Sequence, residues 1–132
     1  MRVGIVGSRK YENKKKIKDF IFTLTEKYDD IIIVSGGCKD GADRYAKKYA
    51  LELNTHYEEY PPAHHSHNLY CPLGEHNYGK SYHVSNYFKR NKQIAIHSDV
   101  VAAFIPDGIV SNGTMSTINY AKKMQKKTVI LN

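Results

Sequence analysis

Three glycine-containing turns, each following an apolar stretch of the chain, carry residues suited to binding an anion. They are Gly7-Ser8-Arg9, Ser35-Gly36-Gly37 and Ser111-Asn112-Gly113-Thr114. Glycine lets the backbone approach a ligand closely, and the start of a following helix offers free N–H groups and the positive end of the helix dipole. If the three turns meet at one place, the pattern predicts a phosphate or nucleotide site.

Two carboxylates near the second turn indicate how a nucleotide would be oriented. Asp40 is expected to cap the following helix, with Asp43 completing a capping box. The alternative for Asp43 is a hydrogen bond to a ribose hydroxyl. Because carboxylates repel phosphate, we expect the phosphate at Ser111–Thr114 and the sugar near Gly36-Gly37. The turns match neither a P-loop ending nor a G-x-G-x-x-G fingerprint.

The elements that position these turns are visible in the hydrophobic periodicity. Strands are expected at 3–6, 31–34, 55–60, 100–105 and 128–131, and helices at 12–28, 42–53, 83–97 and 114–126. Nearly all-apolar strands alternating with helices predict a Rossmann-like three-layer α/β/α sandwich with a mostly parallel five-stranded sheet. Ligands of such sheets bind beyond the carboxyl ends of the strands, so the turns should converge on one crevice. A chain of 132 residues predicts one domain, spanning residues 1–132.

The composition favours an anionic partner without identifying it. The formal net charge is +7 and the isoelectric point is near 9.3. Most lysines stand beside apolar helical positions, where a solvated helix face explains them. Single-stranded nucleic acid remains the second candidate partner, because 11 tyrosines offer stacking surfaces. No apolar run approaches the ~20 residues of a membrane span, so a cytoplasmic protein without a membrane partner is expected.

Residues 61–81 lose all periodicity and form a long histidine-rich loop. Potential metal ligands are concentrated in and just after it: His64, His65, His67, Cys71, Glu75, His76 and His83. Their spacing matches no zinc-finger or H-E-x-x-H pattern, so no metal is expected. The loop is interpreted as a lid whose histidines and tyrosines (Tyr70, Tyr78 and Tyr82) contact a base, or as a plain exposed loop.

Four segments together resemble one known group of proteins. They are "GSRKY", "SGGCKDGADRYA", "YGKSYHVSNYFKRN" and "SDVVAAFIPDGIVSNGTMSTINYA", in this order along nearly the whole chain. They are similar to the SLOG superfamily of Rossmann-like proteins, which includes DprA-like DNA-processing proteins and Lonely Guy phosphoribohydrolases. The small bacterial and phage branch of that superfamily is the most similar.

The resemblance implies a set of ligand-binding residues. These are Gly7, Ser8, Arg9, Ser35, Gly36, Gly37, Gly41, Ala42, Asp43, Arg90, Asn91, Gly113 and Thr114, to which Ser111 and Asn112 are added from the third turn. Lys80 matches less well, because its distance from Arg90 is longer than in the family pattern. The resemblance also implies a homodimer or higher homo-oligomer. No cofactor is expected.

The family comparison leaves catalysis open. Thr117 stands where the Lonely Guy motif has its catalytic glutamate, and cleavage of a glycosidic bond needs a nearby carboxylate. Asp43, Glu75 and Asp99 remain as alternative carboxylates. The expected function is binding of a nucleoside phosphate or ADP-ribose-like ligand, as a sensor, a sequestering protein or an N-glycosidase. The alternative is DprA-like binding of single-stranded nucleic acid.

Overall fold

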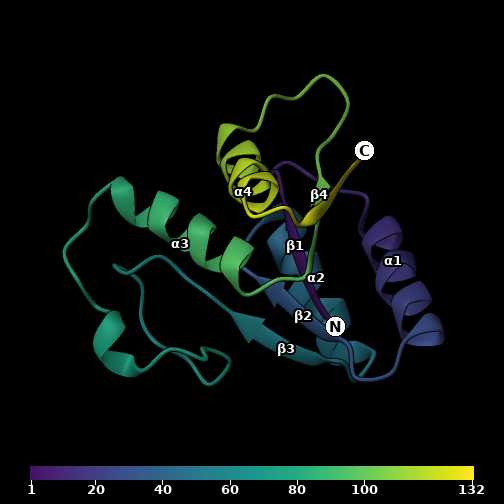
Figure 1. Cartoon of the computed structure of the whole chain (residues 1–132), viewed down its shortest axis with the longest axis horizontal. Helices are drawn as coiled ribbons and strands as arrows, with labels where there is room; N and C mark the ends of the chain where they lie inside the picture. Colours follow the sequence, from purple (N-terminus) through teal and green to yellow (C-terminus); the bar gives the residue numbers. More distant parts are fainter.

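The computed structural model describes residues 1–132 and contains a single five-stranded sheet (Figure 1). The strands are β1 (Arg2–Gly7), β2 (Ile32–Ser35), β3 (His56–Glu59), β4 (Val100–Phe104) and β5 (Lys127–Leu131). Their order is β3-β2-β1-β4-β5, and every neighbouring pair is parallel. The expected α/β architecture is confirmed, with a sheet that is entirely rather than mostly parallel.

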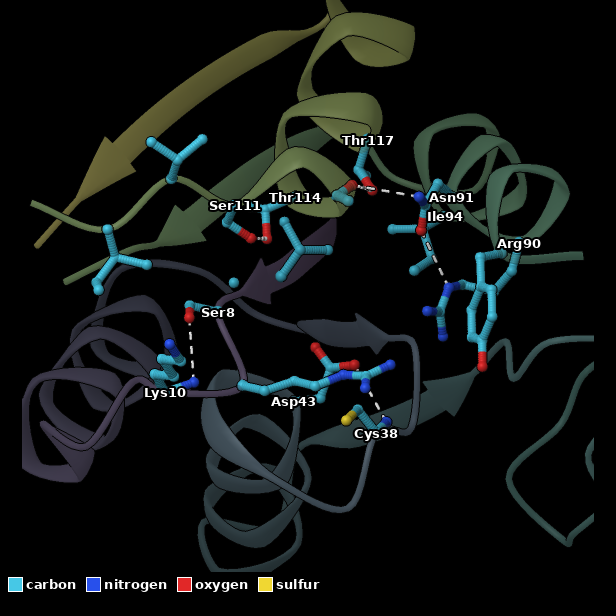
Figure 2. A pocket seen from close by; sticks show the side chains of 17 residues that line it. Ser8, Lys10, Cys38, Asp43, Arg90, Asn91, Ile94, Ser111, Thr114 and Thr117 are labelled. Atoms are coloured by element: carbon cyan, nitrogen blue, oxygen red, sulfur yellow. Dashed lines mark hydrogen bonds between the residues drawn. The ribbon is translucent and has the colours of Figure 1, made fainter. Parts of the chain in front are cut away.

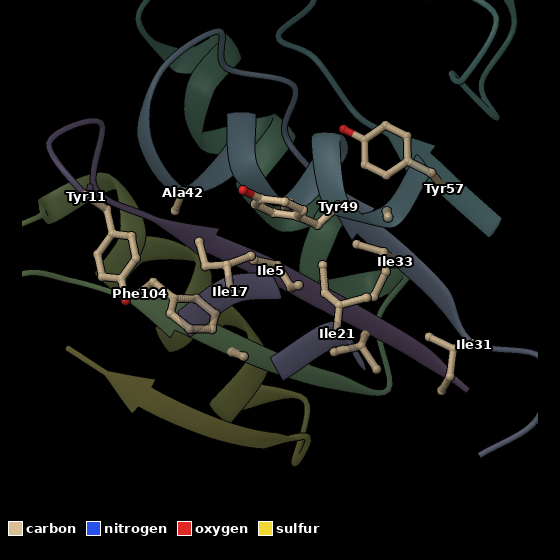
Figure 3. Packing of buried hydrophobic residues seen from close by; sticks show 14 residues of the cluster. Ile5, Tyr11, Ile17, Ile21, Ile31, Ile33, Ala42, Tyr49, Tyr57 and Phe104 are labelled. Carbon is tan, nitrogen blue, oxygen red and sulfur yellow. The ribbon is translucent and has the colours of Figure 1, made fainter. Parts of the chain in front are cut away.

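Helices cover both faces of the sheet. They are α1 (Lys14–Lys27), α2 (Gly41–Glu52), α3 (Ser85–Ile96) and α4 (Asn112–Lys123), with a short 3₁₀ helix, η1, at Glu75–Asn77. Successive residues of a strand face opposite sides of the sheet, and β1 shows the result. Ile5 packs in a cluster with residues of α1 and α2 (Figure 3), whereas Val6 packs in a second cluster with residues of α3 and α4. The two clusters join the central sheet to a layer of helices on each of its faces, which makes the fold a three-layer sandwich.

The element boundaries differ from the expected ones by at most three residues. The largest difference of consequence is at α4, which begins at Asn112 rather than Thr114. This places Asn112, Gly113 and Thr114 in the first helical turn. None of the helices combines the length and apolarity needed to cross a bilayer.

The histidine-rich segment 61–81 contains only η1 as regular structure, but hydrogen bonds fasten it to itself and to β3. The Glu59 amide donates to the Tyr70 carbonyl at 3.0 Å. Within the segment, Gly79 donates to the carbonyl of His65 and Lys80 to that of Ala63, both at 3.0 Å. The segment is therefore held against the β3 edge of the molecule.

The strand order reverses at β1, which lies between β2 and β4. The chain leaves β2 toward α2 on one side of the switch point and leaves β4 toward α4 on the other. In open parallel sheets the crevice at such a point is the place where ligands bind. The turns after β1, β2 and β4 therefore lie where a ligand is expected to bind.

Candidate functional site

A cavity of about 380 Å³ lies at this switch point (Figure 2). The predicted site residues among those lining it are Gly7, Ser8, Arg9, Asp43, Arg90, Asn91, Ser111, Gly113 and Thr114. A second cavity of about 430 Å³ adjoins it and includes Gly36 and Gly37. Arg9, Cys38, Tyr87 and Arg90 line both cavities. The structure thus brings the three turns to one two-part cleft.

The start of α4 is open to the first cavity. The amide N–H groups of Asn112, Gly113 and Thr114 have no partner in the protein, as expected for the first turn of a helix. Ser111 does not cap them, because its hydroxyl is hydrogen-bonded to that of Thr114 at 2.6 Å. A Cβ added at Gly113 would meet no atom within 4 Å. Free donors and empty space therefore coincide here.

The start of α2 is closed by protein atoms. Gly41 has φ of +66°, and a Cβ added to it would lie 2.2 Å from the Ser8 carbonyl oxygen. The Ala42 amide donates to that same carbonyl at 3.2 Å. The turn after β1 therefore occupies the place that an anion would take at this helix.

The expected capping box at α2 is wrong. Asp40 occupies the N-cap position, but its side chain makes no capping hydrogen bond. The Asp43 carboxylate does not close a capping box either, since its Oδ2 accepts the Cys38 amide at 3.1 Å. The reason is local: the β2–α2 loop curls back toward α2, so a loop amide rather than a helix amide reaches Asp43.

Asp43 is the only carboxylate that lines the first cavity. Its side chain is buried, and burial raises the pKa of its carboxyl, while the positive charges of Arg90 and Arg9 act in the opposite direction. The carboxylate lines the same cavity as the guanidinium groups of Arg9 and Arg90. It can accept hydrogen bonds from ligand hydroxyls.

Arg90 and Asn91, adjacent on α3, join the loops on both sides of the cleft (Figure 2). Arg90 Nη1 donates to the Gly36 carbonyl at 2.8 Å, and its Nε donates to Asn91 Oδ1 at 3.1 Å. Asn91 Nδ2 in turn donates to the Gly113 carbonyl at 3.2 Å. A Cβ on Gly36 would lie 2.5 Å from Arg90 Nη1. Gly36 is thus needed to admit the guanidinium, whose remaining N–H groups are free for a ligand.

The charge of the first cavity is positive. Arg9, Lys10 and Arg90 line it, against the single carboxylate of Asp43. The same two arginines, with Lys39, line the second cavity, where Asp40 is the acidic residue. Cations close to free helix N–H groups form an environment suited to phosphate.

Several predicted residues lie outside the lining of the two cavities. Ser35 is buried with an unpartnered hydroxyl, Gly41 packs against the β1 turn, and the side chain of Asn112 is exposed. Glu75 lies in η1, and Asp99 accepts the Arg2 amide at 2.8 Å, so neither places a carboxylate in the cleft. Thr117 does line the first cavity, and its hydroxyl points to the Gly113 carbonyl at 3.5 Å.

The histidine-rich segment contributes less to the cleft than expected. Of its histidines, only His65 lines a cavity, together with Pro62. Tyr70 instead packs edge-on against Tyr57, and Tyr78 is buried. No group of three or more histidine, cysteine or acidic side chains is placed to hold a metal ion.

Two further residues were not anticipated as site residues. Tyr87 lines both cavities. Because it precedes Arg90 by one helical turn, the helical periodicity could have placed it on the same face as Arg90. Glu59 is a buried carboxylate beneath Gly37, and it accepts the Tyr57 hydroxyl at 2.9 Å and lies 3.2 Å from Lys47 Nζ. Nothing in the β3 sequence distinguished Glu59 from its exposed-looking neighbours.

Solved structures share this fold. The molybdenum cofactor binding protein from the phototrophic bacterium Rippkaea orientalis superposes with a TM-score of 0.74 at 20% identity, covering 99% of this chain and 76% of the other. The molybdenum cofactor carrier protein from Chlamydomonas reinhardtii gives a TM-score of 0.68 at 18% identity, covering 98% of this chain and 74% of the other. A search of curated protein sequences found no match.

The sequence itself matches a described family over its first half. A family model described as the YspA, cpYpsA-related SLOG family matches residues 1–67. These residues contain β1, α1, β2, α2 and β3, including the turns after β1 and β2. The chain therefore belongs to the YspA, cpYpsA-related SLOG family, as its glycine-rich motifs indicated.

Proposed function

We propose that the protein binds a phosphorylated small molecule of the nucleotide class, with the phosphate at the start of α4. The observation that carries the proposal is the set of unpartnered N–H groups at Asn112–Thr114, beside empty space in a cavity lined by Arg9, Lys10 and Arg90. Backbone donors at a helix start and fixed guanidinium groups are the usual means of holding phosphate.

The sugar of such a ligand is placed on the opposite wall. Asp43 is the only acidic residue in the first cavity, and phosphate would avoid it. Hydroxyl groups would instead donate to its free Oδ1, since Oδ2 already accepts the Cys38 amide. The ligand would then extend from α4 toward the β2–α2 loop.

Binding without cleavage is the activity that this cleft supports best. Glycoside hydrolysis ordinarily uses a pair of carboxylates flanking the bond. Here Asp43 stands alone in the first cavity, and Thr117 provides no acid or base. The buried Glu59 is occupied by Tyr57 and Lys47. We therefore favour a sensor, sequestering or carrier role over an N-glycosidase.

The carrier role agrees with the names of the structural neighbours, which are described as binding or carrying molybdenum cofactor. Molybdenum cofactor therefore belongs in the ligand panel beside nucleotides. A single-stranded oligonucleotide belongs there as well, because the chain is basic.

Calorimetric titration tests the proposal. Nucleoside 5′-monophosphates, ADP-ribose, molybdenum cofactor and a short oligonucleotide are titrated into the wild type and into Gly113→Val. The valine side chain would fill the space beside the free N–H groups, so phosphorylated ligands should lose at least a hundredfold in affinity while the melting temperature changes little. Asn119→Val, at an exposed position two turns further along α4, is the matched control and should bind normally.

Two results would contradict the proposal. Unchanged affinity of Gly113→Val for phosphorylated ligands would show that the phosphate does not bind at the start of α4. Binding of the oligonucleotide alone, with affinity that falls steeply as salt rises, would instead favour nucleic acid as the partner.

A further inference from the structure

The second cavity has a composition different from that of the first. It is lined by the backbone turn Gly36–Asp40, by Pro62 and His65 from the histidine-rich segment, and by Tyr87 and Arg90 of α3, with Arg9. Because it shares Arg9, Cys38, Tyr87 and Arg90 with the first cavity, one ligand can occupy both. The part of a ligand that enters here meets rings as well as charges.

An aromatic cluster fixes the ring of Tyr87 at the boundary between the cavities. The His64 ring packs edge-on against Tyr87 at 5.1 Å and against Tyr82 at 4.8 Å, and the two tyrosine rings lie 6.2 Å apart. Asn86 Nδ2 lies 3.1 Å from His64 Nδ1 and holds that imidazole in turn. A ring supported from behind in this way loses little freedom when another ring packs on its open side.

His65 is fixed as well. Its ring lies edge-on to His64 at 4.7 Å. Its amide donates to the Pro62 carbonyl at 2.9 Å, and its carbonyl accepts the Gly79 amide at 3.0 Å. Partial burial, together with the charges of His64, Arg90 and Arg9, lowers the pKa of His65. The imidazole is therefore neutral at pH 7 and offers one donor and one acceptor.

Resting on the proposed function above, we propose that the second cavity binds the heteroaromatic ring of the phosphorylated ligand. The ring packs on Tyr87, and the edge of the ring forms a hydrogen bond with His65. Phosphate affinity then comes from the first cavity, and selection among phosphorylated molecules comes from the second. The proposal assigns to Tyr87 and His65 a role as specificity-determining residues.

The alternative is that the aromatic cluster only stabilises the segment 61–81. The two roles differ in what a mutation changes. A residue that serves only the fold alters the affinity for every ligand alike, or alters the melting temperature alone. A ring-binding residue alters the ratio between a ligand with a base and the matching ligand without one.

Calorimetric titration of the four common nucleoside 5′-monophosphates and of ribose 5-phosphate measures that ratio. The wild type should bind its best nucleotide at least about tenfold more tightly than ribose 5-phosphate, the range of one base–aromatic stacking contact. Tyr87→Leu should bring the ratio close to one by weakening the nucleotide far more than it weakens ribose 5-phosphate. Tyr87→Phe, which keeps the ring, should retain most of the ratio.

Matched variants complete the design. Tyr28→Leu removes an exposed tyrosine that lies outside the aromatic cluster and lines neither cavity, so it should keep the wild-type ratio. His65→Ala should weaken the nucleotide several-fold without weakening ribose 5-phosphate, and it also tests the proposal if Tyr87→Leu does not fold.

The outcomes separate this inference from the proposed function. Equal binding of nucleotides and ribose 5-phosphate by the wild type overturns the inference and leaves the phosphate site at α4 standing. Equal losses for both ligands in Tyr87→Leu and His65→Ala also overturn it. Absence of wild-type binding to ribose 5-phosphate and to every phosphorylated ligand of the panel above overturns the proposed function, and the inference with it.

Discussion

The starts of α2 and α4 flank the same central strand, and both contain glycine, yet they are built for different purposes. At α2, Gly41 packs against the backbone of Ser8 and Arg9, and the Ala42 amide is taken by the Ser8 carbonyl. At α4, Gly113 faces open space, and the first-turn amides have no partner. One helix start is used to assemble the protein, and the other remains available to a ligand.

The glycines of these turns serve different purposes in the structure. Gly36, Gly37 and Gly41 make room for the protein's own groups: the Arg90 guanidinium, the Glu59 carboxylate and the Ser8 backbone, respectively. Gly113 makes room for nothing within the chain. The number of glycines at a strand–helix turn therefore does not identify an anion site, because the atoms around a hypothetical Cβ show that several of these glycines serve the protein's own packing.

The largest expected effect comes from adding that Cβ to each helix start. Gly41→Ala forces alanine into a left-handed conformation and against the Ser8 carbonyl, so the free energy of unfolding should fall by about 3 kcal/mol or more. Gly113→Ala should leave it unchanged or raise it by about 0.5–1 kcal/mol, because alanine favours a helix over glycine. Chemical denaturation of both variants measures the difference.

Similar losses for the two alanine variants would contradict the comparison. They would mean that the start of α4 is as closely packed as that of α2.

Arg90 tests whether the two sides act on one ligand. Arg90→Ala removes the guanidinium near the phosphate and should weaken a phosphorylated ligand by about 1.5–3 kcal/mol, the contribution of a hydrogen bond to a charged group. The matching nucleoside should be affected far less. Calorimetry with the nucleotide and nucleoside pair measures both values.

Equal losses for both members of the pair would show that Arg90 acts only by holding the Gly36 carbonyl. Arg90→Lys is the useful companion, because it keeps the charge but not the bridge from Gly36 to Asn91.

Asp43 and Asp40 are expected to have separate roles on the α2 side of the cleft. Asp43→Asn should leave the melting temperature unchanged or raise it, because burial of the ionised carboxylate is unfavourable. It should weaken a ribonucleotide more than the deoxyribonucleotide, which has fewer hydroxyls. Asp40→Ala should cost less than about 0.5 kcal/mol, below the range of a true N-cap, since no capping bond is present.

A clear drop in stability for Asp40→Ala, with both affinities intact in Asp43→Asn, would contradict these roles. Thermal melting and paired titrations of the two variants decide between them.

The smallest effect concerns pH. The lining residues of the β4–α4 loop, Ile109–Thr114, include no titratable side chain, whereas His65 and Asp43 lie on the α2 side. The pKa of His65 is lowered in the folded protein, so the unfolded chain binds its proton first as pH falls. The stability that this histidine contributes is present above about pH 6.5 and is lost below it.

Asp43 acts with the opposite sign, because its raised pKa makes the folded protein take up a proton as pH falls. Comparing the pH dependence of the melting temperature between variants separates the contributions of His65 and Asp43. Between pH 7 and pH 5 the melting temperature of His65→Gln should fall less than that of the wild type. The same decrease in melting temperature for His65→Gln and the wild type would show that His65 does not contribute to the pH dependence of stability.

The fold could be predicted from the sequence because its signals are local. The apolar runs of β1, β2 and β4 read as buried strands, and alternation with amphipathic helices implies parallel pairing. The switch point at β1 follows from topology, and it brought the three glycine turns together as expected. Chain pattern and sheet geometry therefore suffice for the location of the cleft.

The separate roles of the residues within the cleft could not be predicted, because they depend on which atoms meet in three dimensions rather than on the pattern of the sequence. Nothing near Asp43 in sequence shows that the Cys38 amide, rather than a helix amide, reaches its carboxylate. Arg90 was expected to bind a ligand, and nothing in the sequence showed that it also donates to the Gly36 carbonyl, 54 positions away. The buried Glu59 beneath Gly37 likewise became visible only in three dimensions.

The strand order has a consequence for how the protein matures during synthesis. The segment 1–60 can form β1, β2 and β3 with two helices, but β4 pairs with β1 only after about a hundred residues have been made. The Arg2 amide, for example, lacks its side-chain acceptor until Asp99 has been made. Such distant pairings close late in folding because of their loop-closure entropy. A nascent chain therefore completes the closed start of α2 first, and the open start of α4 is made and held in place last.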